Sequence, residues 1–218
     1  MFDTYIEMKI PSDFVNVKKE IAEIKTDIRY FNGNNFIGRK TNGYNAPICL
    51  LTHSAAEALK KVIRALYPLG MTLKVYDCYR PQSAVNDFLS WSKDIKNDSM
   101  KSVFYPNVEK SDLFRNGYIA SKSSHSRGST VDLTIVPINE IDHSKWINFG
   151  TGFDYFDPRS SFLYQDIPVQ NKANRLLLHA LMTSAGFKGY KKEWWHFTLT
   201  NEPYPNTYFE FPVDNLNK

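Results

Sequence analysis

The stretch that decides the fold is Ser123-Ser124-His125-Ser126-Arg127-Gly128-Ser129-Thr130-Val131-Asp132-Leu133-Thr134-Ile135-Val136. Its second half, residues 131–136, is rich in β-branched side chains and predicts a buried strand, which Pro137 ends. Its first half is polar and contains Gly128, whose backbone can bend where other residues cannot. The stretch therefore predicts a polar loop that runs directly into a core strand.

Two more strands are expected to join this one in a sheet. Residues 73–79 alternate in polarity and are rich in strand formers, and Arg80-Pro81 ends them. Residues 194–199 form the last expected strand. Helical segments separate the strands along the chain, and the strands could pair antiparallel. We therefore expect an α+β fold, in which residues 1–218 form a single compact domain with a central antiparallel sheet flanked by helices.

Three helices are expected around this sheet. The first covers residues 50–66, where apolar side chains recur about every 3.6 residues and Thr52 is a plausible N-cap. The second covers residues 83–92. The third covers residues 171–185, and Gly186 ends it in the manner of a C-cap. Extended or loop-rich segments are expected over residues 12–25, 28–46, 97–118 and 139–170.

Composition excludes several classes of partner. The formal net charge is +4, and the basic residues are scattered among acidic ones, so nucleic acid is not an expected partner. No stretch approaches the roughly 20 apolar residues that span a bilayer, so no membrane segment is expected. The sequence does not predict an oligomeric state.

The cellular location of the protein bears on whether its two cysteines form a disulfide. Residues 1–11 lack the basic-then-apolar layout of a signal peptide, which favours a cytoplasmic location, or a periplasmic one if an export signal has been removed. Cys49 and Cys78 are too far apart for a CxxC motif. Two buried thiols and a single disulfide both remain open from the sequence.

His125 and Asp132 are candidate metal ligands. They lie seven residues apart, and on one straight strand this odd offset would place their side chains on opposite faces. Gly128 lets the chain bend between them, so both could converge from a loop and the strand that follows it. Asp132 is flanked by apolar neighbours, where a carboxylate is costly to bury unless it is paired or bound to a cation. Zinc accepts an imidazole and a carboxylate together.

A second segment, Glu193-Trp194-Trp195-His196-Phe197, supplies another imidazole and a spare acid. A catalytic zinc commonly has three protein ligands and one open position, and His125, Asp132 and His196 would complete such a set. Glu193 is then free to act as general base toward a metal-activated water. The two other helical histidines, His53 and His179, are interpreted as capping, packed or surface residues.

Arg80 is the candidate group for stabilising negative charge. It stands where the strand over residues 73–79 ends and a helix follows. A guanidinium stays charged and donates in a fixed fork, so it could stabilise the oxyanion formed on a peptide carbonyl.

Together these motifs resemble a known family. Ser123, His125 and Asp132 in the pattern Ser-x-His-x6-Asp, followed by Glu-Trp-Trp-His and preceded by Tyr-Arg-Pro, resemble the D-alanyl-D-alanine dipeptidases of the VanX type, within the M15 metallopeptidases. The metal motifs are shared with carboxypeptidases and hedgehog-like domains of the wider superfamily. The flanking segments that point to the dipeptidase branch are residues 27–30, 35–38, 152–157, 201–206 and 211–212.

The resemblance implies a role for each matching residue. It implies one zinc per chain, held by His125, Asp132 and His196, in a compact hedgehog/DD-peptidase-like α+β fold. It implies that Glu193 is the catalytic base and later proton donor, and that Arg80 stabilises the tetrahedral intermediate. It also implies that the dipeptide termini contact Asp154, Tyr118 and Ser123.

The activity that the resemblance implies is hydrolysis of D-alanyl-D-alanine to two D-alanines, in the chemistry of the bacterial cell wall. The alternative within enzymes is a D,D- or L,D-carboxypeptidase or endopeptidase that acts on muropeptides. A zinc domain used only for binding is a different class, and the presence of both Glu193 and Arg80 argues against it. A globular domain without metal is the remaining alternative.

Overall fold

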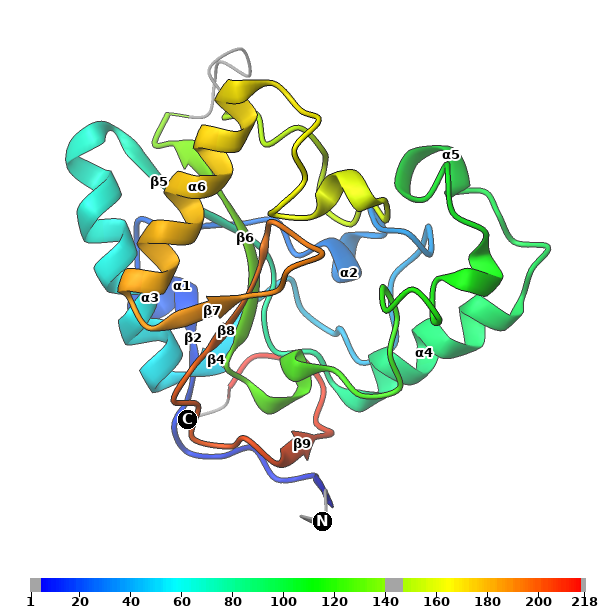
Figure 1. Ribbon diagram of the computed structural model, residues 1–218. Helices are drawn as coiled ribbons and strands as arrows, with labels where there is room; N and C mark the ends of the chain where they lie inside the picture. Colours follow the sequence, from blue (N-terminus) through cyan, green and yellow to red (C-terminus); the bar gives the residue numbers. More distant parts are fainter. Residues whose placement is uncertain (1–4, 140–146, 217–218) are drawn as a thin grey trace.

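A five-stranded mixed sheet forms the centre of the molecule (Figure 1). The computed structural model describes residues 5–139 and 147–216. All neighbouring strands pair antiparallel except β3 and β5, which are parallel. The α+β class is confirmed, and the short parallel edge makes the sheet mixed. The strands, in spatial order, are β3 (Lys25–Thr26), β5 (Met71–Asp77), β6 (Thr130–Pro137), β8 (His196–Leu199) and β7 (Phe187–Gly189).

The three strands expected from the sequence are all present, with shifted ends. β6 extends one residue beyond each end of the predicted 131–136. β5 ends at Asp77 rather than at residue 79. β8 begins at His196, so Trp194 and Trp195 lie in the turn before it. Both tryptophans are nevertheless buried, which explains why the sequence pattern resembles a strand there.

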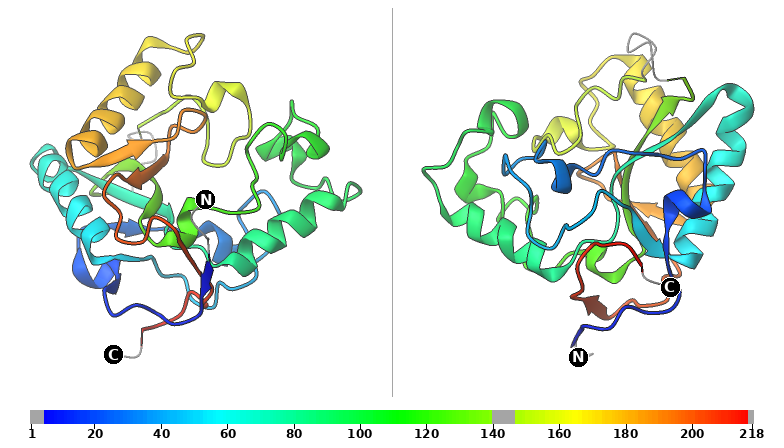
Figure 2. Two further views of the ribbon diagram at one scale, coloured as in Figure 1. Left: turned by 60° about the horizontal axis from the view of Figure 1, so that its bottom comes forward. Right: turned by 180° about the vertical axis from the view of Figure 1, so that it is seen from behind.

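Helices cover the two faces of the sheet. Figures 1 and 2 show α3 (His53–Leu66) and α6 (Val169–Ser184) together on one face, and α4 (Gln82–Lys93) on the other. Side chains alternate along β6, so Val131, Leu133 and Ile135 share one face while Asp132 and Thr134 share the opposite one. The predicted helices over residues 83–92 and 171–185 are confirmed as α4 and α6.

The start of the first predicted helix is wrong. Leu50–Thr52 is a strand, β4, which pairs antiparallel with β2 (Phe14–Asn16), and the helix begins only at His53. Leu50 and Leu51 are fully buried, so packing on both faces overrides a pattern that sequence alone cannot separate from helix. Thr52 occupies the N-cap position, but its hydroxyl bonds Ser129 Oγ at 2.7 Å instead of capping the helix.

The remaining elements are short. The expected loop-rich segments contain several of them, and the predicted loop over residues 139–170 includes residues 140–146, which lie outside the described residues. β1 runs parallel to β9 near the ends of the chain. These elements are β1 (Tyr5–Glu7), α1 (Val17–Glu20), α2 (Arg29–Asn32), η1 (Tyr67–Leu69), α5 (Lys101–Phe104), η2 (Lys110–Asp112), η3 (Ser124–Arg127), η5 (Pro158–Ser160) and β9 (Thr207–Phe209).

A disulfide joins Cys49 to Cys78, with a Cα–Cα distance of 5.3 Å. It ties the residue before β4 to the residue after β5. The sequence left open whether these cysteines are two buried thiols or a disulfide, and the structure has the disulfide. It also fixes the start of the segment that carries Arg80. Within residues 5–139 and 147–216, no helix has both the length and the apolar character needed to cross a bilayer.

Candidate active site

One cavity is lined by all eight residues that were predicted from the sequence to form the site. It has a volume of about 230 Å³ and is lined by side chains of β6 and β8, with side chains of α2 and α4 among its walls. The eight predicted site residues that line it are Arg80, Tyr118, Ser123, His125, Asp132, Asp154, Glu193 and His196.

The loop before β6 places His125. Residues 124–127 form the short helix η3, capped at its start by the Ser123 side chain, which accepts a hydrogen bond from the His125 backbone N–H at 3.3 Å. Gly128 ends η3 with φ +80°, and a Cβ there would lie 2.1 Å from Phe14 Cζ. Only glycine satisfies both the left-handed backbone and this close contact. The predicted bend at Gly128 is therefore present, and it turns His125 toward the strand that carries Asp132.

Strand register brings the other two candidate ligands together. Asp132 on β6 and His196 on β8 are direct partners across the antiparallel pair. Directly opposed residues project their side chains to the same face of a sheet. His196 Nδ1 lies 3.0 Å from Asp132 Oδ1 as a result.

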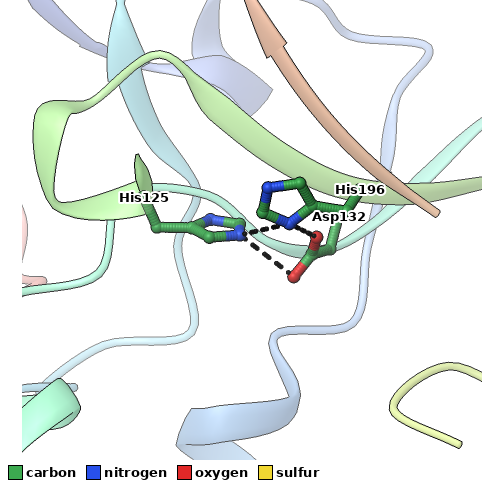
Figure 3. Close-up of side chains that lie close together, drawn as sticks. All are labelled: His125, Asp132 and His196. Atoms are coloured by element: carbon green, nitrogen blue, oxygen red, sulfur yellow. Dashed lines mark hydrogen bonds and ion pairs between the residues drawn. The ribbon is translucent and has the colours of Figure 1, made fainter. Parts of the chain in front are cut away.

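The donor atoms of these three residues converge on one point (Figure 3). His125 Nε2 lies 3.2 Å from Asp132 Oδ2 and 3.2 Å from His196 Nδ1. His125 Nδ1 lies 2.7 Å from the Cys78 carbonyl oxygen. A carbonyl only accepts, so Nδ1 carries the proton and Nε2 presents a lone pair to the cluster. A hydrogen bond from the other ring nitrogen to such an acceptor is what orients a metal-binding imidazole.

The chemistry of this donor set fits a divalent metal ion. Two imidazole nitrogens and a carboxylate offer borderline and hard donors of the kind that zinc accepts, and three protein ligands leave a position open. Asp132 is buried, and although burial opposes its ionisation, His125 and His196 hold the pKa of this carboxyl well below its usual range. An ionised, buried carboxylate between two imidazoles is ready to bind a cation.

Glu193 is the spare acid beside the cluster. Its Oε2 lies 3.7 Å from His196 Nδ1, and the side chain is 11% exposed. Burial raises the pKa of Glu193 to about 8, while the nearby charge of His196 opposes the rise. A carboxylate held this close to three donors, but outside the set that could hold a metal, is placed to exchange a proton.

Arg80 is held rigidly at the wall of the cavity. Its Nε and Nη2 donate to Asp77 Oδ2 at 2.9 and 2.8 Å. The guanidinium also lies 4.9 Å from the ring centroid of Tyr30, which favours a cation over the ring face. Its Nη2 is 3.6 Å from Asp132 Oδ2, so the positive charge borders the cluster of candidate metal ligands. The Arg80 side chain is 12% exposed, so its ion pair with Asp77 is largely shielded from solvent.

Asp154 contributes a second buried acid to the lining of the cavity. It accepts a hydrogen bond from the Tyr30 hydroxyl at 2.8 Å. Burial raises the pKa of Asp154 to about 8, and the negative charge of Asp132 adds to the rise. Its φ of +57° is left-handed, a region that Asp tolerates better than most residues and that is enriched at functional sites.

Tyr118 and Ser123 complete the predicted set. The Tyr118 ring stacks on Phe156 with centroids 5.3 Å apart, and Ser123 lies beside His125. Both line the cavity and carry hydroxyl groups. They offer neutral hydrogen-bond partners for a small polar ligand.

Sequence reasoning missed two supporting residues. Asp77 is fully buried, bonds Arg80, and accepts a hydrogen bond from the Tyr44 hydroxyl at 2.6 Å. The cost of burying a carboxylate among strand residues, which drew attention to Asp132, applies equally to Asp77 and could have found it. Tyr30 contacts both Arg80 and Asp154. It lies in the segment 27–30 that supports the resemblance, but its residue type alone indicates no role. His179 stacks on Phe162 at 4.2 Å and is a packed residue, as expected.

Two imidazoles, a carboxylate, a spare acid and a fixed cation around one small cavity define a class of site, that of a metal-dependent hydrolase. The comparisons with known proteins agree with this class. A family model described as D-ala-D-ala dipeptidase matches residues 11–214. The chain therefore belongs to the D-alanyl-D-alanine dipeptidase family of M15 metallopeptidases.

Individual relatives match along almost their whole length. A D-alanyl-D-alanine dipeptidase of Enterococcus faecium is 38% identical over 200 residues, covering 92% of this chain and 98% of that relative. One of Streptomyces coelicolor is 38% identical over 201 residues, with the same coverage of 92% and 98%. One of Escherichia coli is 30% identical over 192 residues, covering 88% of this chain and 87% of that relative.

Proposed function

We propose that this protein hydrolyses D-alanyl-D-alanine to two D-alanines, with one zinc ion held by His125, Asp132 and His196. The observation that carries the proposal is the convergence of these three donors beside Glu193 and Arg80 in a single small cavity. When bound, zinc would polarise the peptide carbonyl and lower the pKa of water toward roughly 7.

The residues around that ion would each do one task. Glu193 takes a proton from the attacking water at its carboxylate oxygen and later returns it to the leaving amine, as a general base and then a general acid. Arg80, fixed by Asp77, donates to the carbonyl oxygen as it gains negative charge. Because Asp77 already orients the guanidinium, little reorganisation accompanies the reaction.

The two ends of a dipeptide carry opposite charges, and the cavity offers a partner for each. The buried carboxyl of Asp154 is the group for the ammonium, which would also stabilise its ionised form. Tyr118 and Ser123 offer hydroxyl donors for the carboxylate. The preference for D-residues over L-residues is inferred from the relatives, which are named D-alanyl-D-alanine dipeptidases.

The size of the cavity favours a dipeptide over a muropeptide. Its volume of about 230 Å³ is below the roughly 300–1,000 Å³ of sites for drug-sized ligands. A carboxypeptidase or endopeptidase would need room for the rest of the peptide on at least one side of the bond that is cut.

A panel of three peptides tests the proposed function. We expect release of D-alanine from D-alanyl-D-alanine, and roughly 10⁴-fold lower kcat/KM for the N-acetylated dipeptide, which leaves Asp154 without its charge partner. L-alanyl-L-alanine serves as the control for stereochemistry and should be cleaved poorly. Equal rates on the free and N-acetylated dipeptides would indicate a carboxypeptidase, and no release from any of them would contradict the proposal.

The disulfide bears on the location expected from the sequence. Disulfides persist in oxidising compartments and are rare in the cytoplasm. We therefore propose that the Cys49–Cys78 bond forms in an exported protein, in place of the expected cytoplasmic location. Thiol alkylation of the protein as isolated from its native cells tests this. An unmodified mass is expected, and two alkylated cysteines would restore the cytoplasmic prediction.

A further inference from the structure

Two side chains form hydrogen bonds that join two segments lining the cavity. The Tyr190 hydroxyl donates to the Gly117 carbonyl oxygen at 3.3 Å, and Lys192 Nζ donates to the neighbouring Asn116 carbonyl oxygen. We call these two side chains and their two carbonyl acceptors the clasp. Both donors belong to the turn that carries Glu193.

The clasp joins two segments that both line the cavity. Gly117 and Tyr118 of one segment, and Tyr190 and Glu193 of the other, are all among the residues that line the cavity. Gly117 has φ +74°, and a Cβ there would lie 3.2 Å from Lys192 Nζ. A glycine at this position therefore lets the two donors approach the backbone closely.

The turn that carries Glu193 is also held from its other side. The Lys191 carbonyl oxygen accepts hydrogen bonds from the Phe162 N–H at 3.2 Å and the Ser161 hydroxyl at 2.8 Å. The Trp194 N–H donates to the Ser160 carbonyl oxygen at 3.0 Å. These bonds do not involve the clasp. Its loss would remove the side-chain link between the segment that carries Gly117 and the turn, while leaving the turn with Glu193 in place.

We infer that Tyr190 and Lys192 determine substrate length, because the clasp closes the cavity to peptides longer than two residues. This inference rests on the proposed function and deepens it. A closed wall rejects a longer peptide through steric exclusion, and such negative selection needs no contact with the preferred substrate. Opening the wall would therefore relax specificity more than it weakens dipeptide binding.

Binding to zinc-loaded protein tests the inference independently of turnover. Parent and Tyr190→Phe/Lys192→Met proteins are both prepared with Glu193→Gln, and calorimetry measures Kd for D-alanyl-D-alanine and for tri-D-alanine, which extends the dipeptide at either end. In the parent protein, which carries Glu193→Gln alone, we expect D-alanyl-D-alanine to bind at least about 100-fold more tightly than tri-D-alanine. In the double variant we expect this ratio to fall by about tenfold or more, through tighter binding of tri-D-alanine.

Lys191→Met is the matched control, because Lys191 is an exposed lysine in the same turn and contributes only its backbone carbonyl to the contacts described. It should leave the ratio unchanged, and thermal unfolding checks that every variant folds. An unchanged ratio in the double variant, equal weakening of both peptides, or a parent that does not prefer the dipeptide would overturn the inference. Failure of the proposed function is distinct, since it appears as no release of D-alanine by protein that retains Glu193.

Discussion

Replacing Glu193 by glutamine is expected to lower kcat for D-alanyl-D-alanine by about 10²–10⁴-fold while zinc content stays at one ion per chain. Glutamine keeps the size of the side chain but cannot accept the proton of the attacking water. Glu193 lies outside the three-residue donor set, 3.7 Å from His196 Nδ1, so its loss should leave the metal ligands in place. Steady-state kinetics and elemental analysis of the same preparation measure the two effects.

The matched control for this change is Glu109→Gln. Glu109 is an exposed carboxylate that pairs with Lys101 at 2.8 Å and does not line the cavity. Its replacement should leave kcat within about twofold, as expected for a surface substitution. If Glu193→Gln retained kcat within tenfold of the wild-type value, another group would have to be the base, and the assignment of Glu193 would be wrong.

The second large effect is expected from Asp132→Asn. This carboxylate supplies the only formal negative charge among the three donors, and it lies within 3.2 Å of nitrogen atoms of both His125 and His196. An amide of the same shape is neutral and binds a divalent ion weakly. We therefore expect zinc affinity to fall by more than about 100-fold, beyond the range typical of changes to residues that only hydrogen-bond a metal ligand. Competition with a chromogenic chelator measures this affinity.

Asp112→Asn is the control for the loss of one negative charge. Asp112 pairs with Arg115 at 3.0 Å and lies outside the cavity. Zinc affinity should be the same in this variant as in the wild-type protein. Unchanged affinity in Asp132→Asn would mean that the metal binds elsewhere.

The sequence predicted which candidate residues converge better than it predicted the boundaries of the elements around them. The sequence indicated His125, Asp132 and His196 because few residue types bind metal ions. In addition, a carboxylate in an apolar strand is costly to bury unless it is paired or bound to a cation. The bend at Gly128 followed from the odd spacing of the two candidate ligands, His125 and Asp132. These arguments use local features, which a single sequence displays directly.

Features that depend on distant contacts were not predictable in the same way. The strand β4 forms because Leu50 and Leu51 are buried against neighbours far along the chain, and a short apolar run does not distinguish a strand from the start of a helix. The pairing of Tyr30 with Asp154 joins residues 124 positions apart. The disulfide and the clasp likewise depend on which loops meet in space, and a list of residue types does not contain that information.

Zinc titration of the metal-free protein, with D-alanine release from D-alanyl-D-alanine as the readout, tests the central claim most directly. We predict that the rate rises in proportion to added zinc and stops rising at one equivalent per chain, and that Asp132→Asn shows no such break under the same conditions. A full rate without metal, a break at another stoichiometry, or no D-alanine at any zinc concentration would contradict a single catalytic zinc held by His125, Asp132 and His196.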